Sequence, residues 1–480
     1  MKIFEKNKSI ILKILFGISC LMFAIPSILY YINNKTIFEF GMWFRFLLND
    51  GSRIDQTIIY ILILCIMSIL YFTIVKERKD IFKNIKQVIL FIAIISLVFV
   101  IVIPFTCSDV FYYLGIGRIS GTYHQNPYYV TIKEFVEQGD NSNYLKQDTV
   151  LAQGYLNDWS NSTVVYGPVW TFICQSISIM SFGNIDVGLL IFKLINLLVH
   201  ILNCYLIYKI SNKKIFVLSY GLNPFILIEG IACVHNDMFV ILFTLASLYF
   251  LLKKKKIVLS LIFLALATAI KYFTVLLLPF IMIYYVRKEK TSVRFLKCMK
   301  YGIGFVAILS IFYLGYIRDI QVLSGLVIQQ EKLAKSFYIT ISEYFTEPEG
   351  LVKIINKTLL ISFAIVYFFT CLTLLNKKEI KFGKEIKKAN YFIAAFLFLL
   401  ITNFQPWYIM WLFPCLMWMK ADDVKLIIQI SLISQFANSI FLTYGEAWVY
   451  GTPFVVFMLL GTLMSVFYNT RIDKNKKVLN

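Results

Sequence analysis

The residues best suited to chemistry follow the end of a long apolar run, in the stretch from Pro104 to Arg118. A carboxylate just past the end of an apolar helix can meet both water and a lipid-borne substrate, so Asp109 is our candidate general base. Arg118 follows it by roughly three helical turns. The alternative is that Ser108 and Asp109 only cap the following helix, and that Arg118 faces solvent.

Three consecutive polar residues, His235, Asn236 and Asp237, follow the end of another apolar segment. His235 is one of only three histidines, and an imidazole ring can transfer protons or orient a phosphate near neutral pH. Asn236 and Asp237 precede a new apolar run. The alternative is therefore that one of them is the N-cap of the next helix, and that His235 is a structural residue beside that cap.

Two further stretches place polar groups among apolar residues. The Lys271 ammonium would cost about 3 kcal/mol inside a membrane unless it reached water or a partner, so we expect an anion near it. The alternative is that Lys271 extends to the lipid headgroups from a short hairpin. Gln405, Trp407 and Tyr408 combine an amide with aromatic rings that suit the hydroxyls and the apolar face of a sugar. Aromatic belts at membrane interfaces produce the same pattern.

The elements that must position these residues are membrane helices. The chain has 480 residues, of which 59% are hydrophobic and 17% aromatic, and its mean hydropathy is +0.73. Apolar runs of about 15 to 24 residues recur, which predicts an all-α polytopic membrane protein with about 13–15 transmembrane helices. We expect a single integral membrane domain over residues 1–480. The first run, Ser9–Ile32, is too long for a cleaved signal segment and is expected to be retained.

The charge and the cysteines exclude two other classes of protein. The formal net charge of +20 does not predict a nucleic-acid partner, because the lysines form short blocks between apolar runs. Such blocks are typical of cytoplasmic loops that lie against anionic lipid. The nine cysteines show no CxxC or Cys/His spacing, so neither a zinc site nor a disulfide framework is expected. No metal and no cofactor is predicted, although metal dependence stays open.

The basic blocks also predict the topology. The cluster from Lys76 to Lys86 places the N-terminus in the cytoplasm, and the later basic blocks, ending at Arg471, place the C-terminus there as well. Residues 106–187 then form a long extracytoplasmic loop, and residues 318–350 form a second one. The apolar run Tyr166–Phe182 is expected to be juxtamembrane or re-entrant, because a crossing there would put every later lysine block outside.

The same topology brings the unusual polar groups to one side of the membrane. Ile257–Val286 must form a hairpin of two short limbs that turns near residues 268–271 at the outer face. Because the topology was derived from Lys and Arg blocks alone, this gathering independently favours one site. The residues at the outer rim are Asp109, Arg118, His235, Asp237, Lys271, Gln405, Tyr408 and Glu446.

Five short motifs, in order between Pro104 and Pro414, resemble the bacterial polyprenol-phosphate-mannose-dependent mannosyltransferases of the GT-C superfamily. The motifs are Ser108-Asp109-Val110 with Gly117-Arg118 and Asn126-Pro127-Tyr128, Tyr166-Gly167-Pro168-Val169-Trp170, Asn223–Gly230 with His235-Asn236-Asp237, Ala269-Ile270-Lys271-Tyr272, and Gln405-Pro406-Trp407-Tyr408. The resemblance implies a GT-C-like bundle in the bacterial cell membrane, whose first long extracytoplasmic loop contains juxtamembrane helices. It also implies that Asp109 is the catalytic base or its close partner.

The implied activity is an inverting hexosyltransferase of the EC 2.4 class, with mannose favoured. Its donor would be a polyprenyl-phosphate sugar from the bilayer, and its acceptor a cell-envelope glycan or glycolipid on the extracytoplasmic face. Such a reaction needs a carboxylate base and cations that stabilise the leaving phosphate, for which we assign Lys271, Arg118 and His235. The residues assigned to the sugar or acceptor are Asp237, Asn236, Tyr166, Gln405, Trp407, Tyr408 and Glu446.

Two other classes of protein share parts of this pattern. A transporter or flippase of a lipid-linked sugar would also be polytopic and basic inside. It should, however, show charges near the membrane midplane and broken helices in two related halves. The sequence offers only Lys271 and no similarity between halves. A non-catalytic scaffold of cell-wall assembly would leave the polar rim unexplained.

Overall fold

The computed structural model describes residues 2–32, 53–319, 322, 324–331, 336, 338 and 348–444. The regular elements of this part of the chain are helices. Five of them are long and apolar enough to cross a membrane, and a bent pair would make a sixth. The prediction of an all-α polytopic membrane protein is confirmed. The five are α1 (Lys2–Ile32), α2 (Arg53–Lys76), α9 (Ile185–Ser211), α14 (Thr291–Tyr313) and α17 (Pro348–Asn376).

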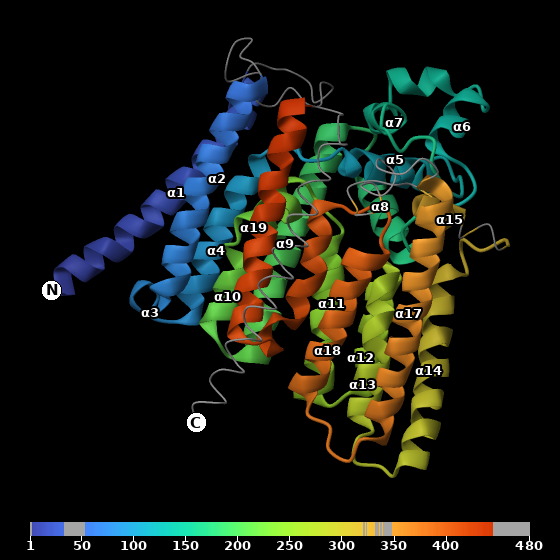
Figure 1. Cartoon of the computed structure of the whole chain (residues 1–480). Helices are drawn as coiled ribbons and strands as arrows, with labels where there is room; N and C mark the ends of the chain where they lie inside the picture. The colour runs from blue at the N-terminus through green and yellow to red at the C-terminus, as the bar shows by residue number, and fades with distance from the viewer. Residues whose placement is uncertain are drawn as a thin grey trace.

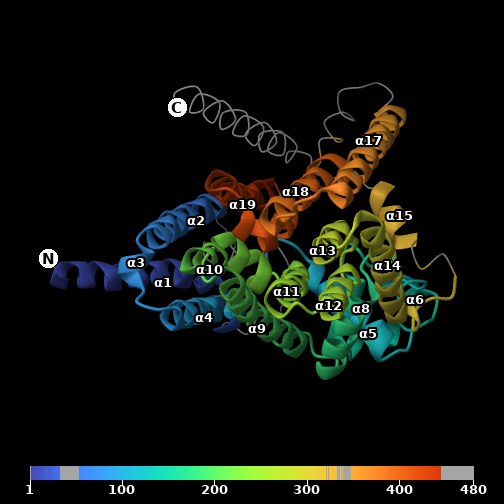
Figure 2. The same ribbon diagram turned by 90° about the horizontal axis from the view of Figure 1, so that it is seen from below.

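One bundle is built from both ends of the chain (Figures 1 and 2). The helices α1, α2, α4 (Ile85–Ile101), α9 and α10 (Lys214–Gly221) pack together, and α19 (Ala421–Tyr444) packs on α2. The contact between α19 and α2 includes hydrogen bonds as well as apolar packing. The Tyr60 hydroxyl donates to the Gln435 carbonyl at 2.9 Å and accepts from the Gln435 amide at 2.8 Å. The C-terminal helix of the described chain is thereby fixed to the N-terminal bundle.

The remaining apolar runs form short or broken helices. The predicted hairpin is present as α12 (Ile257–Thr268), a turn, a 3₁₀ helix η5 (Tyr272–Leu277) and α13 (Leu278–Tyr285). The predicted span Ile215–Cys233 is a bent pair, α10 and η3 (Ile226–Ala232), with a 60° angle between its parts. Other pieces are α11 (Asp237–Tyr249), η4 (Phe250–Lys254), α18 (Phe382–Ala395), η7 (Phe396–Leu400) and η8 (Pro406–Trp418). The expected span Thr452–Asn469 lies outside the described residues.

Residues 106–187 form a helical cap at one end of the bundle, at the upper right of Figure 1. The cap contains α5 (Asp109–Gly121), α6 (Ile132–Glu137), η2 (Ser142–Lys146), α7 (Thr149–Tyr155) and α8 (Pro168–Met180). The 13 residues of α8 rise about 20 Å, which is shorter than the apolar core of a bilayer. The basic connections, including α3 (Arg78–Ile81) and the α13–α14 link, lie at the opposite end. α15 (Ser324–Glu331) belongs to the expected second loop.

Glycine allows the cap helices to approach closely. A Cβ atom on Gly117 of α5 would lie 2.2 Å from the Cys174 carbonyl oxygen of α8. Likewise, a Cβ atom on Gly115 of α5 would lie 2.8 Å from the Cα atom of Gly154 in α7. Small residues commonly permit such close backbone approach between helices of membrane proteins. Because α5 begins at Asp109, this packing fixes where that carboxylate lies.

We expect Gly117→Ala to lower the free energy of unfolding by about 1–3 kcal/mol, because the added methyl group forces α5 away from α8. Gly304→Ala on α14 is the matched control, since nothing lies within 4 Å of its Cβ position. Thermal unfolding of both variants in the same detergent measures the difference. Equal midpoints for the two variants would show that α5 and α8 are not in this close contact.

Candidate active site

Four chain segments with irregular backbone meet where the cap joins the bundle. They are the start of α5 with Asp109, the η3–α11 junction with His235 to Asp237, the α12–η5 turn with Lys271, and η8. The side chains of Asp109, His235, Asn236, Asp237 and Lys271 are all buried. Non-helical backbone in a membrane protein is tolerated only inside the protein or around a cavity, so this convergence marks a site.

The η3–α11 junction is conformationally strained. η3 is a π-helix with Cys233 as its C-cap, and the next residue, Val234, has a φ of 62°. A β-branched residue rarely adopts this left-handed conformation, which costs of order 1–3 kcal/mol. The strained turn is held by the His235 backbone N–H, which donates to the Glu229 carbonyl at 3.1 Å. It brings the His235 side chain to Asp109 and the Asp237 side chain to Lys271.

Asp109 is the first residue of α5 and is 8% exposed. The Tyr113 hydroxyl donates to its Oδ2 at 3.3 Å, and His235 Nδ1 lies 3.9 Å from the same oxygen. Burial in the cap raises the pKa of the Asp109 carboxyl, while His235 and Lys271 act in the opposite direction. Ser108 makes no capping hydrogen bond with its side chain, so the structure does not show the capping role considered for it.

Lys271 and Asp237 form a buried ion pair. The Lys271 ammonium donates to Asp237 Oδ1 at 2.7 Å, and the Trp411 indole N–H donates to the same oxygen at 2.5 Å. The ammonium also lies 4.5 Å from the ring centroid of Tyr408. Asp237 is thus the anion expected near Lys271, and the lysine does not extend to the headgroups. Asn236, before α11, makes no capping hydrogen bond with its side chain.

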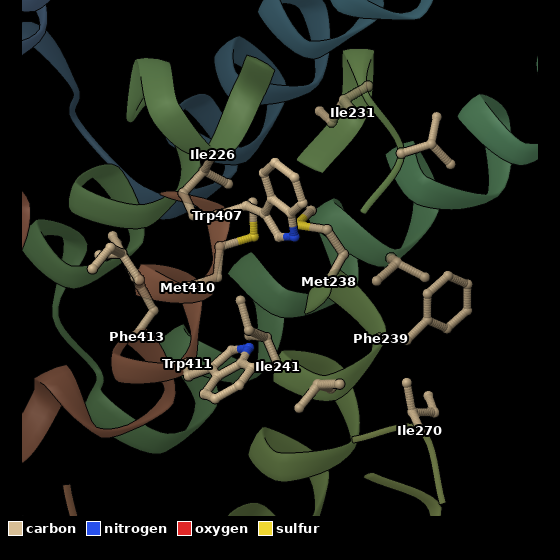
Figure 3. Packing of buried hydrophobic residues seen from close by; sticks show 14 of the residues in the cluster. Ile226, Ile231, Met238, Phe239, Ile241, Ile270, Trp407, Met410, Trp411 and Phe413 are labelled. Atoms are coloured by element: carbon tan, nitrogen blue, oxygen red, sulfur yellow. The ribbon is translucent and has the colours of Figure 1, made fainter. Parts of the chain in front are cut away.

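The aromatic side of the site comes from η8, a 3₁₀ helix of 13 residues, where runs beyond three or four residues are uncommon. Side chains three residues apart are eclipsed in a 3₁₀ helix. Tyr408 and Trp411 therefore stack, with ring centroids 4.6 Å apart. Trp407 stacks on the His235 ring at 4.1 Å. In Figure 3, Trp407 and Trp411 lie among buried side chains between η8 and α11.

The site also contains hydrogen-bonding groups that the protein leaves unused. Asn236 is fully buried, yet neither atom of its amide has a hydrogen-bond partner. Asp237 Oδ2 has none either. Buried polar groups without partners are rare in native proteins, and a missing ligand is one explanation. Tyr166 lies on the Asp109 side of the site, with its hydroxyl 3.4 Å from that of Tyr113.

The structure places Arg118 away from this group, which corrects its assignment to the donor phosphate. Nine residues of α5 separate it from Asp109, a rise of about 13 Å. Its guanidinium is paired with Asp148 at 2.5 Å, and the Tyr123 hydroxyl donates to the same carboxylate at 2.8 Å. Arg118 therefore stabilises the cap. The assignment failed because the partner of Arg118, Asp148, lies 30 positions later in the chain, and the residues around Arg118 give no sign of this contact.

The other assigned residues have mixed outcomes. Gln405 precedes η8 and donates to Asn403 Oδ1 at 2.8 Å, so it lies at the edge of the aromatic side. Glu446 lies outside the described residues. Sequence reasoning gave no role to Tyr113, Glu229 or Trp411. Glu229 had a signal, because an acid inside an apolar run is itself a pointer to function. Trp411 had a weak one, since a residue three positions after Tyr408 shares its face in an α-helix as well as in a 3₁₀ helix.

One group of described residues could hold a metal ion. Ligand atoms of Cys107, Asp109 and His235 lie within 4.8 Å of one another, and all three residues are buried. The Cys107 sulfur lies 3.4 Å from His235 Nε2. The spacing rules for metal motifs missed this group because His235 comes from a distant segment.

The comparisons with known proteins give one match. A family model described as alpha-(1->6)-mannopyranosyltransferase, N-terminal domain (MptA_B family) matches residues 16–287, more than half of the chain. No curated protein and no solved structure matches. The match confirms the resemblance drawn from the motifs. It contains Asp109, His235, Asp237 and Lys271, whereas η8 lies beyond it.

We expect Lys271→Met to destabilise the protein by about 3–5 kcal/mol, because the buried Asp237 carboxylate loses its cation. The double variant Lys271→Met with Asp237→Asn should regain most of this loss, since the amide is neutral and still accepts from Trp411. Thermal unfolding of the single and double variants in detergent checks the expectation. A double variant no more stable than Lys271→Met would show that the charge of Asp237 is not the cause.

Proposed function

Because the chain belongs to the alpha-(1->6)-mannopyranosyltransferase family, we propose that it transfers mannose, with inversion, from a polyprenyl-phosphate sugar to a cell-envelope glycan or glycolipid. Membership of the family makes the chain a mannosyltransferase of the EC 2.4 class and favours an enzyme over a transporter. The donor, the stereochemistry and the acceptor are the proposal. The observation that carries it is the different pairing of two neighbouring carboxylates, Asp109 and Asp237.

Asp109 is suited to be the base. Its direct neighbours are a tyrosine hydroxyl at 3.3 Å and an imidazole nitrogen at 3.9 Å, and neither neutralises it as a lysine contact would. Burial raises the pKa of the Asp109 carboxyl, which makes the carboxylate a better proton acceptor near neutral pH. We place the acceptor hydroxyl next to it. Its proton would pass to Asp109 as the oxygen attacks the anomeric carbon.

The pairing of Asp237 supports a single displacement with inversion. Retention through a covalent sugar intermediate would require a second carboxylate free to attack. Asp237 has an unpartnered Oδ2, but its charge is compensated by the Lys271 ammonium and its Oδ1 also accepts from Trp411, which makes it a weaker nucleophile. Asp237 would therefore position Lys271 rather than attack the sugar.

Lys271 is suited to the leaving phosphate. Asp237 uses one of the three ammonium hydrogens, so the others can donate to phosphate oxygens as negative charge develops there. The rings of Tyr408 and Trp411 hold the ammonium from one side. The unpartnered amide of Asn236 supports a role in binding sugar hydroxyls. We now place His235 with Asp109, because its ring faces that carboxylate.

The bilayer would supply the donor. The helices α14 and α17 flank the site region. Only 6% of the residues in the most apolar part of each helix are buried, as expected for helices that face lipid. We place the protein in the bacterial cell membrane with both termini in the cytoplasm, and the cap outside, because the basic connections lie at the opposite end. The proposed chemistry uses the donor's own leaving group and needs no nucleic acid or cofactor.

Asp109→Asn should reduce mannose transfer by about a hundredfold to ten-thousandfold, because an amide cannot accept the proton. Its effect on stability should stay within about 1 kcal/mol, as for a weak cap. The rate of transfer from polyprenyl-phosphate mannose, at matched protein level, measures the effect on activity. Thermal unfolding measures the effect on stability. Asp186→Asn, at the exposed start of α9, is the matched control and should transfer normally. Near-normal transfer by Asp109→Asn would remove it as the base.

The proposed orientation can be tested with reporters. One placed at Gly139–Asp140 in the cap should respond as extracytoplasmic, and one placed within Lys253–Lys256 should respond as cytoplasmic, because the basic end is expected inside. Gly139–Asp140 is in a turn, and Lys253–Lys256 begins in the last residues of the short η4 and continues into the connection to α12. The opposite pattern would reverse the assignment of the two faces.

A further inference from the structure

Four polar residues form a stripe along the buried face of α9, a helix long enough to cross the membrane. They follow one another at spacings of three, four and three residues, which places them on one side of the helix. Polar groups inside a membrane helix are costly, and the proposed reaction uses none of these side chains. The stripe consists of Lys193, Asn196, His200 and Asn203, all buried.

Each side chain of the stripe meets a backbone carbonyl at or beside a break in a neighbouring helix. α9 packs against α4, α10 and α11, which surround it in Figure 2. Irregular backbone inside a membrane needs hydrogen-bond partners that a regular helix would supply itself. α9 therefore provides these partners. The carbonyls belong to Val102 at the end of α4, Gly221 at the end of α10, Gly230 in η3 and Met238 near the start of α11.

Lys193 holds the segment that leads to Asp109. Residues 102–108 connect α4 to α5 without helix, and the first six of them are buried. The Lys193 ammonium donates to the carbonyl of Val102, which is the C-cap of α4 and begins this segment. A cation is favoured at the C-terminal end of a helix, because the carbonyls there carry partial negative charge. The position of Asp109 therefore depends on an anchor in α9.

Asn196 lies one turn further along the same face and holds the segment that leads to His235. Its amide donates to the Gly230 carbonyl at 2.6 Å, within the π-helix and five residues before His235. Asp109 Oδ2 and His235 Nδ1 meet at 3.9 Å in the site. The two segments that bring these side chains together are thus fixed to a single turn of α9, through Lys193 and Asn196.

We propose that Lys193 and Asn196 are positioning residues that set where Asp109 stands in the site, an inference that rests on the proposed function. Both act through the backbone of other segments. The acceptor hydroxyl must lie within hydrogen-bond reach of the carboxylate, and a displacement of about 1 Å can cost about a hundredfold in rate. Lys271, which we assign to the donor phosphate, lies on the α12–η5 turn and is held by Asp237 instead. Donor binding should therefore not depend on Lys193.

The test compares Lys193→Met with Lys193→Gln. Both side chains are unbranched, uncharged and equal in length, but only glutamine can donate to the Val102 carbonyl. We expect kcat of Lys193→Met to fall about tenfold to a hundredfold with the KM for polyprenyl-phosphate mannose unchanged. Lys193→Gln should recover most of the loss. Lys209→Met, exposed in the last turn of α9, is the matched control and should keep the natural kcat.

The same comparison in the Asp109→Asn background separates positioning from a purely structural role. An asparagine cannot accept the proton wherever it stands, so Lys193→Met should lower the residual transfer by less than about twofold there. A structural role would reduce transfer equally in both backgrounds. Equal losses, or the same kcat for Lys193→Met and Lys193→Gln, would overturn the proposal.

If Lys193→Met does not fold, Asn196→Leu decides, because it removes the donor to Gly230 and adds no charge. A loss of kcat confined to the background that keeps Asp109 supports the proposal, and an equal loss in both backgrounds overturns it. The proposed function fails separately, through absence of transfer by the natural protein or near-normal transfer by Asp109→Asn.

Discussion

The site depends on keeping buried charges paired where little water can reach them. The Lys271–Asp237 contact is the clearest case, because both side chains are buried and each would be costly alone. This one pair joins the start of α11 to the α12–η5 turn, and the Trp411 N–H adds η8 to it. Three segments far apart in the chain are thus held around one point. Glu229 Oε2 lies 3.1 Å from His235 Nε2, and Asp109 has no lysine within ion-pair distance among the described residues.

Departure from regular helix is the means by which the backbone reaches this arrangement. The π-helix η3 and the left-handed Val234 turn His235 and Asp237 toward different partners, and the 3₁₀ geometry of η8 stacks Tyr408 on Trp411. Each departure costs free energy that regular α-helix would not. Such costs are usually found at functional sites, where they position side chains.

The general architecture could be predicted from the sequence. Long apolar runs predicted membrane helices, and a hairpin between two basic blocks predicted the turn that holds Lys271. The cost of a lone ammonium predicted an anion beside it, which is Asp237. The motifs predicted the mannosyltransferase family. These successes share one basis, because hydropathy, basic blocks and short motifs are local properties of the chain.

The sequence by itself therefore determined the membrane class, the family and the chemical types of the site residues. Only the tertiary structure decided which charges are paired. Arg118 was expected at the phosphate and is instead bound to Asp148 in the cap, while Glu229 contacts His235 and Asn438. Asn438 lies 209 residues after Glu229. Pairing depends on which side chains the packed helices bring within about 3 Å, and contacts across such separations leave no local pattern in the sequence.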